Sequence, residues 1–91
     1  MAYVFHFSPD AMTSEKYDEC IRRLDAAGAG APAGRVYHVC YGSPDRLRVF
    51  DVWESQEAFE RFGPTLLPIL QELGIDPGTP EVVETHNLIA G

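Results

Sequence analysis

Apolar and aromatic runs alternate along the chain with polar, turn-forming segments. Four runs, at residues 2–7, 35–41, 47–53 and 81–89, have the length and the β-branched and aromatic content of strands. They are apolar on both alternations, which a sheet with one face in water does not tolerate. We therefore expect both faces of the sheet to be covered.

The first helix is expected directly after the first strand. Thr13 and Ser14 offer N-cap oxygens, and a glycine-rich loop at residues 28–34 ends the helix. Between these limits the apolar positions recur at helical spacing: Tyr17, Cys20, Ile21, Leu24 and Ala27. The pattern predicts an amphipathic helix with one face on the sheet.

The second helix begins after Ser55, which is a suitable N-cap, and its apolar stripe starts with Ala58, Phe59 and Phe62. Gly63-Pro64 and then Pro68 remove backbone donors from its interior. We therefore expect this helix to be kinked or broken, with a second piece from Pro64 to Leu73 and Gly74 at its C-cap.

Residues 42–46 connect the second and third strands, and Pro44-Asp45 suits a type I turn, so these strands form a hairpin. The element order is β-α-β-β-α-β. With right-handed crossovers it predicts an α+β fold with a four-stranded antiparallel sheet and both helices on one face, in a single domain over 1–91. The uncovered face is apolar, and a second copy of the chain would cover it.

Composition narrows the functional classes. The formal net charge is −7, and the seven Lys and Arg residues form no basic stripe, so we expect no nucleic-acid partner. The apolar runs are too short for a membrane span and the N-terminus lacks a signal-peptide pattern, so we expect no membrane partner and a cytoplasmic location. Cys20 and Cys40 lack metal-type spacing and read as two small buried hydrophobes.

Four segments carry a resemblance to a known superfamily: Met12–Asp18, Val49–Ser55, Glu57–Phe59 and His86–Ile89. On these segments the whole chain resembles the dimeric α+β barrel superfamily of small ferredoxin-like proteins, which includes the antibiotic-biosynthesis monooxygenases. It is most similar to uncharacterised small members that share the Tyr37-His38 pair and the late His-Asn-Leu-Ile.

The resemblance implies a homodimer in which two sheets face each other, with a ligand cavity between sheet and helices in each subunit. Members of the superfamily include oxygenases, cyclases, isomerases and haem degraders. The polyketide cyclases use a histidine early on the first strand, which His6 matches, but their second histidine has no counterpart between Ser55 and Leu73. The haem degraders use asparagine on the first strand, where this chain has His6.

The three histidines, His6, His38 and His86, all lie in strand-like runs and are the candidate catalytic bases. Each could instead be a structural histidine bonded to a carbonyl or carboxylate. Alternation places His38 on one face with Val36 and Cys40. It also places His86 beside Glu84, a carboxylate that could orient the imidazole.

Asp51 is the most unusual polar residue of its strand, because its face is otherwise apolar. Its carboxylate must pair with a histidine or arginine, Arg48 and Arg35 being candidates, or face a cavity. The expected substrate-binding residues are Tyr37, Tyr41, Asp51, Trp53 and Phe59, although large aromatics also serve in cores and interfaces.

No metal-type histidine spacing, nucleophile elbow or phosphate-binding loop is present, so the sequence predicts neither a metal nor a cofactor. We expect an enzyme or binder of a small aromatic or polyketide-like molecule, with cofactor-independent monooxygenation as the first hypothesis. A cyclase or isomerase that uses a histidine base without O₂ is the second hypothesis. A non-catalytic dimeric ligand-binding or stress-response protein is the third.

Overall fold

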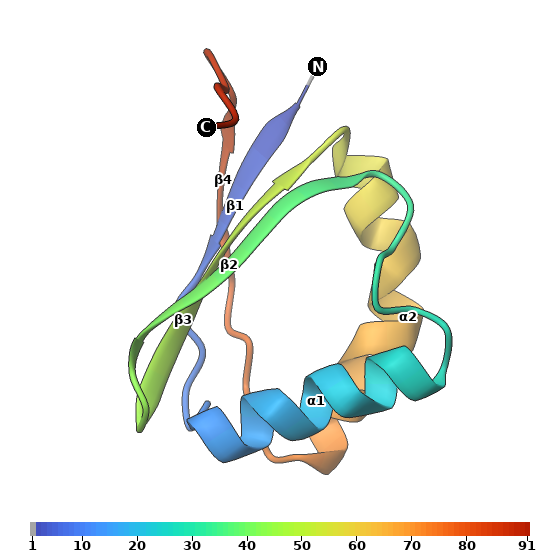
Figure 1. Cartoon of the computed structure of the whole chain (residues 1–91), viewed down its shortest axis with the longest axis vertical. Coiled ribbons are helices and arrows are strands. Elements are labelled where there is room, and N and C mark those ends of the chain that lie inside the picture. Colours follow the sequence, from blue (N-terminus) through green and yellow to red (C-terminus); the bar gives the residue numbers. More distant parts are fainter. Residues whose placement is uncertain (1) are drawn as a thin grey trace.

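The computed structural model describes residues 2–91, and within them it contains two helices and one four-stranded antiparallel sheet of order β2-β3-β1-β4 (Figure 1). The elements are β1 (Tyr3–Phe7), α1 (Ser14–Ala26), β2 (Arg35–Ser43), β3 (Arg46–Trp53), α2 (Gln56–Glu72) and β4 (Glu81–Glu84). Both helices lie on one face of the sheet (Figure 1). The predicted element order, sheet and helix placement are confirmed.

Helix α1 has the ends that the sequence predicts. Thr13 is the N-cap, and its hydroxyl accepts a hydrogen bond from the backbone N–H of Lys16 at 3.2 Å. At the other end Gly28 adopts a φ of 73°, and the N–H of Ala29 donates to the carbonyl of Leu24 at 2.8 Å. This arrangement is a Schellman motif, in which glycine supplies the left-handed residue that closes the helix.

Helix α2 runs from Gln56 to Glu72 with Pro64 and Pro68 inside it, so the predicted break is wrong. Its ribbon does change direction along its length (Figure 1), as expected where proline removes a backbone donor. Burial of Phe62 and Leu70, one on each side of Pro64, keeps both parts against the sheet. Tertiary packing of this kind supplies most of the stability of a helix in a protein and outweighs a local breaker.

The strand register assigns each histidine of the sheet to one face. His38 of β2 pairs with Asp51 of β3, and Asp51 pairs with Phe5 of β1. This row of side chains faces the helices. His6 belongs to the alternate row, opposite Phe50. His6 and His38 therefore lie on opposite faces of the sheet.

A β-bulge between Arg35 and Tyr37 interrupts the regular alternation of β2. Val36 is the extra residue and is 49% exposed. The expectation that Val36 shares one face of the strand with His38 is therefore wrong, because the extra residue shifts the alternation at this point.

Strand β4 ends at Glu84, so the predicted strand over 81–89 is too long. Its only neighbour is β1, which begins at Tyr3, and the backbone N–H of Thr85 bonds the carbonyl of Ala2 at 2.9 Å. Beyond this point the described part of β1 offers no further backbone partners. His86 and the residues after it therefore leave the sheet and are exposed.

The hydrophobic core fills the space between the sheet and the helices. Its buried members are Phe5, Phe7, Met12, Cys20, Leu24, Leu47, Val49, Trp53, Ala58, Phe62, Leu70 and Ile75. Within residues 2–91, neither helix has the length and apolar composition needed to cross a lipid bilayer.

Candidate functional site

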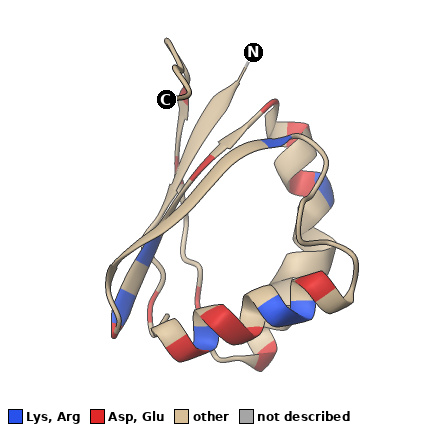
Figure 2. Cartoon of the chain, in the orientation of Figure 1, with Lys and Arg blue, Asp and Glu red and all other residues tan. Residues whose placement is uncertain are grey.

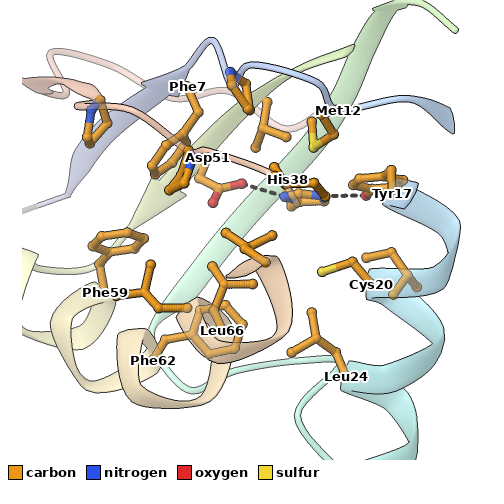
Figure 3. A pocket seen from close by; sticks show the side chains of 18 of the residues that line it. Phe7, Met12, Tyr17, Cys20, Leu24, His38, Asp51, Phe59, Phe62 and Leu66 are labelled. Atoms are coloured by element: carbon orange, nitrogen blue, oxygen red, sulfur yellow. Dashed lines mark hydrogen bonds and ion pairs between the residues drawn. The ribbon is translucent and has the colours of Figure 1, made fainter. Parts of the chain in front are cut away.

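A cavity of about 200 Å³ lies within this layer, between the sheet and the two helices (Figure 3). Most of its wall is apolar: Phe7, Pro9, Met12, Ile21, Leu24, Val49, Phe59, Phe62, Leu66, Leu67, Leu70, Ile75, Pro77 and Pro80. Cys20 adds a free thiol whose pKa is raised by burial, so it contributes a neutral surface. The wall therefore has few polar side chains, and these are the candidates for chemistry in the cavity.

His38 is the centre of a hydrogen-bonded chain at the wall of this cavity (Figure 3). Its Nε2 lies 2.6 Å from the hydroxyl of Tyr17 on α1, and its Nδ1 lies 2.5 Å from Oδ1 of Asp51 on β3. The indole N–H of Trp53 donates to the other carboxylate oxygen of Asp51 at 3.2 Å. Helix α1 and strands β2 and β3 thus each supply one part of the chain.

The direction of the hydrogen bonds follows from Tyr17. Burial, and then the nearby Cys40 thiol, raise the pKa of its hydroxyl to about 12, so the phenol is neutral at physiological pH. A neutral phenol donates its proton to Nε2 of His38, and the imidazole then carries its own proton on Nδ1 and donates it to Asp51. This order gives His38 the tautomer of a general base held by a carboxylate.

Asp51 is 6% exposed and is the one buried charged residue among residues 2–91. Both of its oxygens are hydrogen-bonded, so the cost of burying the carboxylate is offset by two donors. The predicted pairing with a histidine therefore occurs, through His38, whereas the alternative ion pairs with Arg48 or Arg35 do not form.

The other two histidines lie away from the cavity. His6 bonds the hydroxyl of Tyr41 through its Nε2, and both side chains project from the opposite face of the sheet. His86 is exposed beyond the end of β4. The structure therefore does not bring the three candidate bases together, and His38 is the one that lines the cavity.

The residues expected to bind substrate also divide between the two faces. Asp51 and Phe59 line the cavity. Trp53 is fully buried behind them, with its indole ring edge-on to Phe59 at a centroid distance of 5.4 Å. Tyr37 and Tyr41 lie on the opposite face of the sheet.

Tyr17 is the residue of the polar chain that sequence reasoning did not select for chemistry. It occupies the first position of the apolar stripe of α1, where an aromatic ring reads as core. Its hydroxyl finds a partner 21 positions along the chain, on a different element. Local periodicity carries no signal of such a pairing.

Comparison with protein-family models gives no match, and comparison with curated protein sequences gives none either. Solved structures do match. SnoaB, a cofactor-independent oxygenase from Streptomyces nogalater, is similar over 99% of this chain and 96% of its own, with a TM-score of 0.63 and 18% identity. A protein named YJCS is similar over 94% of this chain and 100% of its own, with a TM-score of 0.67 and 8% identity.

A third structure, from Deinococcus radiodurans and provisionally assigned as an antibiotic biosynthesis monooxygenase, covers 99% of this chain and 97% of its own, with a TM-score of 0.61 and 12% identity. At such low identities the likeness concerns the fold. The chain has a ferredoxin-like fold, the fold also seen in these antibiotic-biosynthesis-monooxygenase-like structures. The resemblance inferred from the sequence is confirmed at that level.

Proposed function

We propose that this protein is an enzyme that removes a proton from a small aromatic hydroxyl compound and directs the resulting anion to react with O₂, without a cofactor. The observation that carries the proposal is the Tyr17–His38–Asp51 chain at the wall of an otherwise apolar cavity. A base oriented by a buried carboxylate, next to a water-poor space, is the arrangement that general-base chemistry requires.

The proton path begins at the substrate hydroxyl. As Tyr17 passes its own proton to Nε2 of His38, its oxygen accepts the proton of the substrate. Because Asp51 accepts the Nδ1–H bond, it stabilises the imidazolium that forms. The high pKa of Tyr17 means that it acts as a carrier in this step, since the tyrosinate does not accumulate at neutral pH.

The electrons come from the substrate itself. One oxygen atom of O₂ bonds to a ring carbon that carries a hydrogen, and the ring becomes a quinone. The second oxygen atom leaves as water with two hydrogens of the substrate. The phenol is thus the reductant and O₂ the oxidant, and the apolar wall protects the reactive anion from water.

The cavity limits the size of the substrate. A cavity of about 150 Å³ is sufficient for benzene, so a space of about 200 Å³ accommodates one aromatic ring or two fused rings. SnoaB is a cofactor-independent oxygenase with the same fold, which supports the oxygenase proposal over other chemistry. A cyclase or isomerase would use the same base, and oxygen consumption distinguishes the two.

The test is oxygen uptake with a panel of one-ring and two-ring phenols. We expect uptake by the wild type and a loss of 10²-fold or more in His38→Gln, which is of the order that general-base catalysis contributes. His6→Gln is the matched control, because His6 lies on the opposite face of the sheet. Equal oxygen uptake by the His38 and His6 variants would exclude His38 as the base. Cyclised or isomerised product without oxygen uptake would favour a cyclase or isomerase.

The functional unit that we propose is a homodimer formed through the sheet face opposite the helices. That face carries Tyr37, which is 52% exposed, and Val83, which is 48% exposed, beside half-buried Val4, Val39 and Phe50. Apolar surface of this kind on a small protein marks an interaction site. A two-fold axis through the sheet would bury it against itself.

A further inference from the structure

Among the described residues, Arg35 is the one lysine or arginine in the wall of the cavity. It opens β2 and is the only charged residue of that strand, as Figure 2 shows by the long uncharged stretch that follows it. A guanidinium remains charged at all physiological pH values, so its place in an apolar wall needs an explanation.

The β-bulge is what places Arg35 on this face. Tyr37 pairs with Val52 on the face opposite the helices, and regular alternation would put Arg35 on the same face as Tyr37. Because Val36 is inserted, Arg35 pairs instead with Trp53, whose row faces the helices and the cavity. Bulges commonly re-aim a side chain beside a functional site.

Arg35 also has spare hydrogen-bonding capacity. Within residues 2–91 it forms no salt bridge, and its side chain donates a hydrogen bond from Nη2 to the carbonyl of Gly30 at 3.0 Å. The other half-buried arginine, Arg23, is paired with both Glu19 and Glu72. Arg35 therefore has guanidinium N–H groups that can donate hydrogen bonds to another partner.

A second hollow adjoins the cavity at this point and is lined by Ala31, Pro32, Arg35, Val36, Tyr37 and His38. Arg35 and His38 border both spaces. Since Val36 and Tyr37 are about half exposed, the second hollow lies at the protein surface. Arg35 thus stands where the apolar cavity meets the outside.

We propose that Arg35 binds a carboxylate of the substrate, so that the ligand is a hydroxylated aromatic acid with its ring in the cavity and its acid group at the mouth. The guanidinium fork matches a carboxylate with two parallel N–H···O bonds, and a carboxylate at the mouth keeps partial contact with water. With a formal net charge of −7 the chain as a whole repels anions, so selection of an acid depends on a local cation. This inference rests on the proposed function and specifies its substrate class.

The test compares 2-naphthol with hydroxynaphthoates that carry the carboxylate at different ring positions, with binding followed by naphthalene fluorescence at pH 7. We expect at least one hydroxynaphthoate to bind the wild type tenfold or more tightly than 2-naphthol does. Arg35→Gln should abolish this preference and leave 2-naphthol affinity unchanged. Arg35→Lys keeps the charge but loses the planar guanidinium, so it should lose part of the preference for the acid. Arg48→Gln is the control, because Arg48 belongs to the opposite face of the sheet.

A readout on the wild type covers the case in which the Arg35 variants do not fold. The Nε–H resonance of Arg35 should shift on addition of the preferred hydroxynaphthoate and not on addition of 2-naphthol. Equal binding of naphthol and acids, or a preference that survives Arg35→Gln, would overturn the carboxylate site while the proposed proton transfer stands. Absence of binding by every one of these compounds would count against both.

Discussion

The rings of Tyr17 and His38 are nearly parallel, with 5° between their planes and 6.0 Å between their centroids. The phenolic oxygen is 2.6 Å from Nε2. Because the lone pair of Nε2 lies in the plane of the imidazole, near-parallel planes let the hydroxyl approach along that lone pair. The two side chains are thereby joined into one proton-transfer unit before any substrate binds.

This relationship predicts an unusual alkaline titration. Burial raises the pKa of Tyr17 from 10.0 to about 12, so one tyrosine should ionise well after the ordinary range when tyrosinate absorbance is followed with increasing pH. Tyr17→Phe should remove that late component and leave the rest of the curve in place. A wild-type curve with no component later than the ordinary tyrosine range would contradict the buried phenol.

The same shift has a consequence for stability. The folded-state pKa of Tyr17 is above its unfolded value, so its contribution to stability is fully present below pH 10 and is lost as the pH rises from about 10 to about 12. Denaturant unfolding over this range should therefore show a fall in stability that is smaller in Tyr17→Phe. An equal fall in both proteins would assign the effect to other groups.

Asp51→Asn should reverse the tautomer of His38. The amide oxygen would accept the Trp53 N–H, leaving the amide NH₂ against Nδ1 of the imidazole, so the ring proton would move to Nε2. Nitrogen-15 shifts of the imidazole measure this change. Loss of bonds to a buried charge should also cost roughly 1.5–3 kcal/mol, with Tm falling about 4–8 °C per kcal/mol. An unchanged tautomer and Tm would show that Asp51 does not hold the ring.

Gly34 should tolerate no side chain. Its φ is 89°, and a Cβ at this position would lie 2.5 Å from the Cβ of Ala58 on α2. Gly34→Ala therefore combines backbone strain with a clash against packed atoms, and we expect a loss of about 1–3 kcal/mol of unfolding free energy. Gly78→Ala is the control, because its φ is also positive, at 65°, but open space surrounds it. Equal losses in the two variants would mean that α2 moves freely away from the loop.

The proposed dimer should dissociate when a charge is placed on the sheet face that forms it. Tyr37→Glu introduces a charge on the sheet face opposite the helices, at a side chain already 52% exposed, so the subunit itself should remain folded. Sedimentation at micromolar concentration should show a dimer for the wild type and a 10.1 kDa monomer for the variant. Leu67→Glu, at an equally exposed apolar position on α2, should remain dimeric. A folded wild-type monomer would exclude the assembly.

Local signals in the sequence were sufficient for most of the fold. The N-cap hydroxyls of Thr13 and Ser55 and the glycine at residue 28 act within one turn of helix, so their effects can be predicted without knowledge of the rest of the chain. The continuity of α2 and the short β4 could not be predicted in this way. The first depends on packing against the sheet, and the second depends on where β1 begins.

The candidate site was predictable only in part. Asp51 was identifiable because a carboxylate within an apolar row must have a partner, and that partner is His38. The separation of His6 from His38 required the strand register, and the role of Tyr17 required the position of α1 over the sheet. These are long-range relationships, for which a single sequence carries no periodic signal.

The bulge at Val36 makes the backbone pairing of β2 as important to the site as its composition. Regular pairing of the same residues without the bulge would turn Arg35 to the far side of the sheet, while every side chain named in the proton path stayed in the protein. Deletion of Val36 would not do this, because Arg35 would then directly precede Tyr37 and would still lie opposite Trp53. A survey limited to the side chains that line the cavity would not reveal this dependence, since Val36 is not among them. Substitutions of Val36 that favour regular pairing at the start of this strand are thus the changes most able to convert the protein from one ligand preference to another.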